Sequence, residues 1–122
     1  MNTRAKIVSD IVNPARPVLL VTGLFEILRV EMVRELSGAR QRTGAKSVVA
    51  VVLSQAEERM PLARRAEMAA ALRVIDYVII SGAGEWESLA ARLQPVEIIH
   101  LEEADALRTR ELIEHVRRCQ AR

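Results

Sequence analysis

The residues best placed to do chemistry lie between Thr22 and Val33, directly after the apolar run at residues 17–21. Gly23 ends this strand-like run, and a helical pattern begins a few residues later. A glycine at such a junction lets the backbone approach a ligand closely, and the free N–H groups of a helix N-terminus attract anions. Arg29 adds a positive charge near the start of the helical pattern. This arrangement suits the binding of a phosphate group.

The spacing within this segment resembles the signature G-x-F-D-x-x-H-x-G-H of the cytidylyltransferase-like nucleotidyltransferases. Gly23 and Phe25 match the glycine and the phenylalanine of the signature. Its aspartate, first histidine, later glycine and second histidine correspond here to Glu26, Arg29, Glu31 and Met32. The segment resembles in particular the adenylyltransferases of ADP-heptose synthesis and the glycerol-phosphate cytidylyltransferases. It keeps the frame of the motif without its histidines.

Four later segments extend the resemblance over roughly residues 16–119. Residues 61–65 are similar to the family's P-L-x-E-R helix, and residues 69–78 to its A-A-L-x-x-V-D-x-V passage into the next strand. Residues 86–95 end in R-L-x-P, and residues 107–113 stand where the family has a serine/threonine-rich entry to its last helix. The resemblance implies a Rossmann-like fold and a homo-oligomer. It also implies a nucleoside triphosphate with magnesium as cofactors if any activity remains.

The family's reaction depends on the two histidines that this chain lacks. Nucleotidyl transfer develops charge on phosphate oxygens, which positioned donors and cations must stabilise. In the family the two histidines meet the phosphates, whereas Arg29 cannot exchange a proton and Met32 offers no charge and no strong donor. Losing such donors costs about 3 kcal/mol or more each in transition-state stabilisation. We therefore expect no catalytic residue and an inactive enzyme.

Other segments that face the ligand in the family are altered as well. Residues 50–54 are mostly apolar where the family has a polar N-x-D, and His100 replaces the lysine of a K-G-G-D-Y-like substrate segment. Arg65 matches the family's helix arginine, and Thr109 matches one hydroxyl of its serine/threonine motif. The resemblance thus implies a residual nucleotide- or phosphate-binding site without a metal ligand, formed by Gly23, Leu24, Phe25, Arg29, Arg65, His100 and Thr109.

The periodicity of the chain indicates the same architecture independently of the resemblance. We expect strands at residues 18–21, 47–53, 77–80 and 97–101, and helices near residues 28–42, 61–73, 85–93 and 108–119. The strand runs lack polar alternation, as do strands buried on both faces of a parallel sheet. Alternating strands and helices predict an α/β fold, a three-layer Rossmann-like sandwich with helices on both faces of a mainly parallel sheet of about four to five strands. One domain is expected over residues 16–122, with residues 1–15 as a leader or packing arm.

Composition excludes several classes of protein. The chain has 122 residues, a net charge of +2, and one residue each of Phe, Tyr and Trp. Basic residues are interspersed with acidic ones and aromatic stacking platforms are scarce, so we expect no nucleic-acid partner. No apolar run approaches the ~20 residues that span a bilayer and no signal peptide is apparent, which predicts a cytoplasmic protein without membrane contact. Cys119 is the single cysteine, so an internal disulfide is excluded.

Three functions remain open at this point. The chain could be an inactive nucleotidyltransferase-like domain, a pseudoenzyme kept as a weak nucleotide- or phosphate-binding or assembly module. It could be an active nucleotidyltransferase, transferring an adenylyl or cytidylyl group to a sugar or polyol phosphate, with Arg29, Arg65 and His100 carrying the reaction. It could also be a purely structural module whose cleft is filled by side chains. The alanine-rich residues 61–74 would permit close helix packing in a homo-oligomer.

Overall fold

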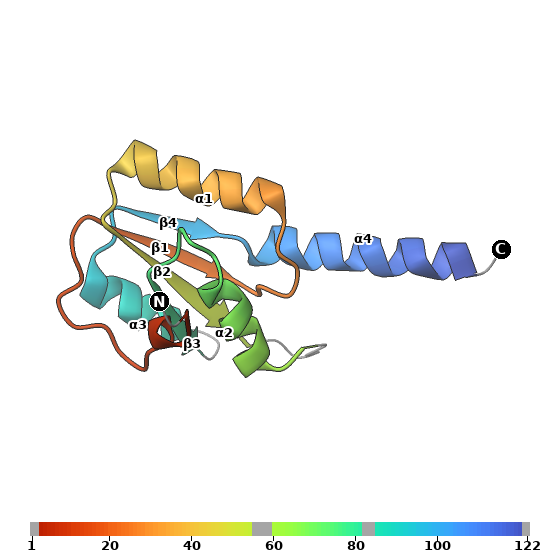
Figure 1. The fold of residues 1–122 in the computed structure, drawn as a ribbon, viewed down its shortest axis with the longest axis horizontal. Helices are drawn as coiled ribbons and strands as arrows, with labels where there is room; N and C mark the ends of the chain where they lie inside the picture. The colour runs from red at the N-terminus through yellow and green to blue at the C-terminus, as the bar shows by residue number, and fades with distance from the viewer. Residues whose placement is uncertain (1–2, 55–59, 82–84, 121–122) are drawn as a thin grey trace.

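The computed structural model describes residues 3–54, 60–81 and 85–120 (Figure 1). Its strands are β1 (Val18–Gly23), β2 (Ser47–Leu53), β3 (Tyr77–Ser81) and β4 (Glu97–His100). Its α-helices are α1 (Val30–Thr43), α2 (Leu62–Ala70), α3 (Glu85–Leu93) and α4 (Glu102–Gln120), and a short 3-10 helix, η1 (Thr3–Lys6), precedes β1. The strands form a parallel sheet in the order β3-β2-β1-β4.

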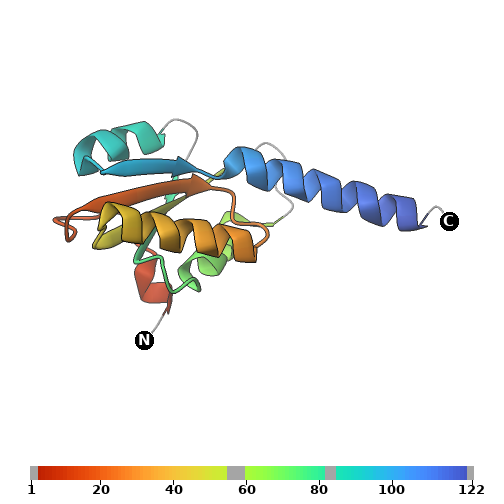
Figure 2. The same ribbon diagram turned by 90° about the horizontal axis from the view of Figure 1, so that it is seen from above.

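The sheet lies between two layers of helices, which confirms the α/β sandwich expected from the sequence. Figure 2 shows α1 and α2 on one face of the sheet and α3 on the other. Successive side chains of a strand point to opposite faces, so Leu19 and Val21 pack under α1 and α2, whereas Leu20 packs under α3. All residues of β1 are buried. Burial on both faces explains why the strand runs show no polar alternation.

The N-terminal segment protects the outer edge of the sheet. Ile7 forms a parallel bridge with Val78 of β3, which is an edge strand. Farther along, the carboxylate of Asp10 lies 2.6 Å from the guanidinium of Arg92 on α3. This hydrogen bond with Arg92 is the main reason why the pKa of Asp10 lies below its ordinary value. The segment therefore satisfies backbone groups that an edge strand would otherwise expose.

The alanine-rich face of α2 is used within the chain. Ala66, Ala69 and Ala70 are buried in the core between α2 and the sheet. This face was expected to pack between copies of the chain, but the chain's own sheet already covers it. The expectation of a homo-oligomer stays a prediction, and it needs a different surface.

Helix α4 begins earlier than the sequence pattern predicts. We expected a helix from about residue 108, whereas α4 starts at Glu102, directly after β4. Acidic residues in the first turn, Glu102 and Glu103, favour this start because they complement the positive end of the helix dipole. Among the helices of the described residues, none is both long and apolar enough to cross a membrane.

Two glycines of α1 should respond in opposite directions to replacement by alanine. Gly44 ends the helix with φ 68°, a left-handed conformation, whereas Gly38 lies inside the helix with nothing within 4 Å of an added Cβ. Gly44→Ala should lower the free energy of unfolding by about 1 kcal/mol, and Gly38→Ala should raise it by about 0.5–1 kcal/mol. Denaturant unfolding of both variants measures this difference. Changes of the same sign would contradict the assigned end of α1.

Candidate functional site

The order of strands reverses between β1 and β4. From β1 the chain proceeds to β2 and β3 on one side, and then returns to place β4 on the other side of β1. In open α/β sheets, ligands bind outside the carboxyl ends of the strands at such a point. Thr22 of β1 and His100 of β4 are paired in register at this end of the two strands. The candidate site is therefore built around these two residues.

Thr22, His100 and Glu102 form what we call the switch-point cluster. The hydroxyl of Thr22 donates a hydrogen bond to Oε2 of Glu102 over 2.7 Å, and its oxygen lies 2.7 Å from Nδ1 of His100. The same Nδ1 lies 3.3 Å from Oε1 of Glu102. The indole ring of Trp86, on α3, meets the imidazole edge-on with ring centroids 5.0 Å apart. Thr22 is buried, whereas 45% of the His100 side chain is exposed.

These hydrogen bonds determine how His100 presents its ring. Because the Thr22 proton goes to Glu102, the contact between Thr22 and Nδ1 requires a proton on that nitrogen. A neutral ring then carries its lone pair at Nε2, where it can accept a hydrogen bond from a ligand hydroxyl. A protonated ring can instead donate to a phosphate, although the carboxylate of Glu102 opposes the approach of an anion. The cluster suits a weakly bound polar ligand.

Arg65 has contacts unlike those that the resemblance implies. Its side chain is fully buried, and Nη1 donates to the backbone carbonyls of Leu24 at 3.0 Å and Leu53 at 2.7 Å. Nε donates to the carbonyl of Met60 at 3.1 Å. The guanidinium thus joins the loop after β1, the end of β2 and the approach to α2. A role as a phosphate ligand stays a prediction, but these contacts argue against it.

The apolar positions of the motif contribute to the core. Gly23, Leu24 and Phe25 are buried, and Phe25 has φ 55°, a conformation that residues other than glycine seldom adopt. Its ring packs in the core under α1 and α2 together with Met32, which is 2% exposed. Met32 therefore occupies the second histidine position of the motif as a packing residue.

Arg29 lies at the beginning of α1. It is the N-cap residue of the helix, with an extended backbone and no side-chain cap hydrogen bond. Together with Leu28, Val30 and Val33 it lines an open hollow of about 310 Å³. Most of this lining is aliphatic, so the hollow has few groups that could hold a phosphate.

The predicted ligands do not converge on one cleft. Thr22 continues the alternation of Leu20, which packs under α3, so its side chain and that of His100 lie on the α3 face. Arg65 extends from α2 on the opposite face. Thr109 lies on α4, and its side chain is outside the part that the structure describes. The pairing of β1 with β4 thus places His100 next to Thr22. Arg65, which was predicted to share the site, lies on the other face of the sheet.

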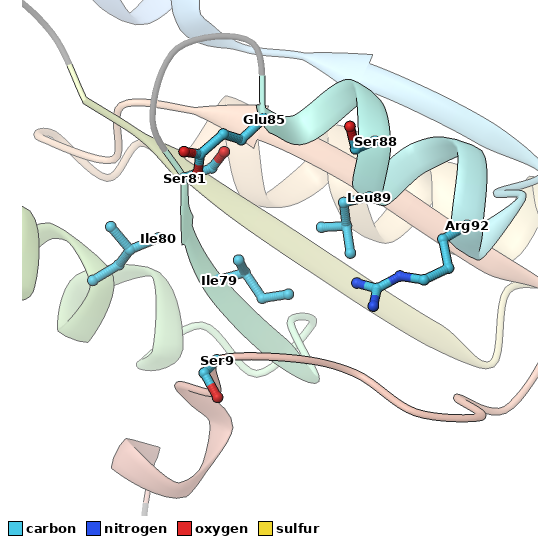
Figure 3. Close-up of a pocket in the computed structure, with 8 residues that line it drawn as sticks. All are labelled: Ser9, Ile79, Ile80, Ser81, Glu85, Ser88, Leu89 and Arg92. Atoms are coloured by element: carbon cyan, nitrogen blue, oxygen red, sulfur yellow. The ribbon is translucent and has the colours of Figure 1, made fainter.

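A separate hollow of about 430 Å³ lies beside the edge strand β3 (Figure 3). Figure 3 shows Leu89 and Arg92 of α3 on one side, Ile79 of β3 on another, and Ser9 of the N-terminal segment below. The guanidinium of Arg92 is already paired with Asp10. Sequence reasoning missed this hollow because its walls come from segments far apart in the chain.

Sequence reasoning also missed Thr22 as part of a site. A hydroxyl near the end of an otherwise apolar strand was the available signal, since the carboxyl ends of parallel strands are where ligands bind. Glu102 was not among the predicted site residues. Its contacts with Thr22 and His100 depend on β4 lying next to β1, which no local pattern specifies.

Comparison with known proteins supports the fold alone. No family model and no curated protein matches the chain. Among solved structures, the chain is similar to the lipopolysaccharide core biosynthesis protein from Thermoplasma volcanium GSS1, with 19% sequence identity and a TM-score of 0.57. The match covers 66% of this chain and 70% of that chain. This likeness agrees with the Rossmann-like α/β fold described above.

The contacts of Arg65 predict a large loss of stability on its removal. Arg65→Ala would leave three carbonyls without this donor, and should lower the free energy of unfolding by about 3 kcal/mol or more. Its neighbour Arg64 is exposed, so Arg64→Ala should change stability by no more than about 0.5 kcal/mol. Denaturant unfolding compares the two variants. Equal stabilities would contradict a structural role for Arg65.

Proposed function

We propose that this chain is a catalytically inactive domain of nucleotidyltransferase-like fold that serves as an assembly module. The observation that carries the proposal is the burial of Arg65 against the carbonyls of Leu24 and Leu53. A phosphate that drew the guanidinium away would leave buried carbonyls unsatisfied, at a cost of about 1–3 kcal/mol each. At the carboxyl ends of β1 and β2, the chain's own carbonyl groups thus accept the hydrogen bonds that Arg65 would otherwise donate to a phosphate.

The residues at the two histidine positions support the loss of catalysis. Met32 is buried in the core and offers no strong donor, and Arg29 cannot take up or release a proton near neutral pH. Each missing transition-state donor corresponds to a loss of about 100-fold or more in rate. An active enzyme is the weaker alternative, because Arg65 and His100 would have to meet one substrate from opposite faces of the sheet.

Assembly is supported by the surface of α4. Leu112 and Val116 of this helix are 51% and 44% exposed, although comparable residues of α1 and α3 are buried against the sheet. Exposed apolar residues grouped on one element mark interaction sites more often than isolated ones do. The domain therefore offers a surface for a partner, and within the part of the chain that the structure describes the candidate catalytic groups Arg65 and His100 do not converge.

The absence of catalysis can be tested directly. Incubation with ATP or CTP, magnesium and a sugar or polyol phosphate should release no pyrophosphate above a protein-free control. The physical reason is the lack of proton-exchanging donors at Arg29 and Met32. Pyrophosphate release that rises in proportion to protein concentration and falls in Arg29→Ala would contradict the proposal.

Weak binding of a nucleotide or phosphorylated small molecule is a second candidate function. The observation that favours it is the exposed imidazole of His100 at the reversal of strand order, held by Thr22 and Glu102. Such binding would need none of the lost catalytic groups, and it is compatible with a role in assembly.

An NMR titration with ATP should locate this binding. Shifts should centre on Thr22, His100 and Glu102, with a dissociation constant on the order of a millimolar. His100→Ala should remove the response, and Glu102→Gln should strengthen it because a negative charge is lost. His115→Ala, at an exposed position on α4, serves as the matched control and should change nothing. Equal losses in both histidine variants, or shifts away from the cluster, would contradict this site.

A further inference from the structure

An open hollow of about 450 Å³ lies between helix α1 and the turn that joins α2 to β3. One side of α1 supplies four of its lining residues, and the turn supplies the other two. The lining residues are Val33, Ser37, Arg40, Gln41, Arg73 and Val74. Four of these six side chains carry hydrogen-bond donors, and none of the six is acidic. This combination favours an anionic ligand.

Arg40 is held in place by the chain and still offers donors to a ligand. Its Nη1 donates to the backbone carbonyl of Val74 over 3.2 Å and lies 3.6 Å from Oδ2 of Asp76. Asp76 is fixed in turn, because the same Oδ2 accepts a hydrogen bond from the backbone N–H of Val48 over 2.8 Å. Both contacts of Arg40 use Nη1, and in the described part of the chain Nε and Nη2 have no partner. A guanidinium oriented in this way can bind an oxyanion through its other edge with little loss of side-chain entropy.

Arg73 supplies a second cation on the opposite wall of the hollow. It is exposed, and its guanidinium has no hydrogen bond or ion pair with the residues that the structure describes. The carbonyl of the preceding Leu72 accepts a hydrogen bond from Nζ of Lys6 over 3.1 Å, which brings an ammonium group to the same turn. On α2, the carboxylate of Glu67 is already paired with Arg4 at 3.4 Å. The turn therefore has a local excess of positive charge, which attracts an anion.

We propose that this hollow binds the phosphate group of a small organic phosphate monoester, at a site separate from the switch-point cluster and independent of the assembly function. The three terminal oxygens of a phosphate can accept from the two guanidinium groups and from the side chains of Ser37 and Gln41. A carboxylate has fewer oxygens and only a single charge, so it satisfies fewer of these donors. The hollow is larger than a phosphate group, and Val33 and Val74 provide apolar walls for the organic part of the ligand.

An NMR titration with inorganic phosphate at constant ionic strength tests the site. Shifts should centre on Ser37, Gln41 and Arg73, with a dissociation constant on the order of a millimolar. Arg73→Gln should weaken binding by about fivefold or more, because it removes a charge-assisted donor, and the exposed position should leave the fold unchanged. Arg64→Gln removes the same charge from an exposed position on α2, and as the matched control it should change nothing. No shifts in the hollow, or equal losses in the two arginine variants, would overturn the proposal.

Phenyl phosphate and acetate test the chemistry of the ligand. Phenyl phosphate should bind more tightly than inorganic phosphate, because its ring removes the apolar surface of Val33 and Val74 from water. Val33→Thr should reduce this advantage while the binding of inorganic phosphate stays the same, since the phosphate donors are retained. Acetate at the same ionic strength should bind more weakly than either phosphate. Equal affinities for acetate and phosphate, or no gain from the phenyl group, would overturn the assignment to a phosphate monoester.

The switch-point cluster provides an internal control for the location of the site. The hollow lies beside α1, on the face of the sheet that α1 and α2 cover, whereas His100 lies on the face that α3 covers. His100→Ala should therefore leave the phosphate response of Ser37, Gln41 and Arg73 unchanged. Loss of that response in His100→Ala would assign the phosphate to the switch-point cluster and overturn the proposal. Pyrophosphate release in the activity assay would overturn the proposed function without changing this titration, so the two failures are distinguishable.

Discussion

The buried guanidinium of Arg65 joins three segments at the carboxyl edge of the sheet. A buried charge is costly unless its hydrogen-bonding groups are satisfied, and here the carbonyls of Leu24, Leu53 and Met60 accept from it. Two of these carbonyls belong to the loop after β1 and the end of β2, where a fold of this type accommodates ligands. The same interaction therefore stabilises the domain and limits how far this edge can open.

The alternation of side chains along β1 places the two polar groups of interest, His100 and Arg65, on opposite faces of the sheet. Leu19 and Val21 face the layer of α1 and α2, and Thr22 belongs with Leu20 on the side of α3. The hydroxyl of Thr22 consequently meets His100 and not the arginine on α2. A shared catalytic constellation would need groups from both faces to reach one substrate. The observed division leaves Thr22 and His100 as a small local site on the α3 face.

Much of the fold could be predicted from the sequence because local patterns determine it. The apolar run at residues 47–53 and the helical pattern at residues 85–93 have the bounds that β2 and α3 show in the structure. The beginning of α4 was missed because residues 102–107 are mostly polar or alanine and resemble a loop, although acidic residues suit a first helical turn.

The site could be predicted far less well, because its contacts join distant residues. Arg65 bonds to Leu24, 41 positions away, and Thr22 meets His100 across 78 positions. The second contact exists because β4 adds to the sheet beside β1, and strand order is not encoded in any local period. The resemblance identified His100 and Arg65 as positions of interest, but it could not show that one is exposed and the other is buried.

Glu102 connects the candidate site to helix α4. It is the first residue of α4, and its carboxylate holds both Thr22 and His100. A helix that projects from a domain gains little stability from tertiary packing, and isolated helices of this length are marginal in water. The contacts of Glu102 with Thr22 and His100 therefore stabilise the first turn of α4.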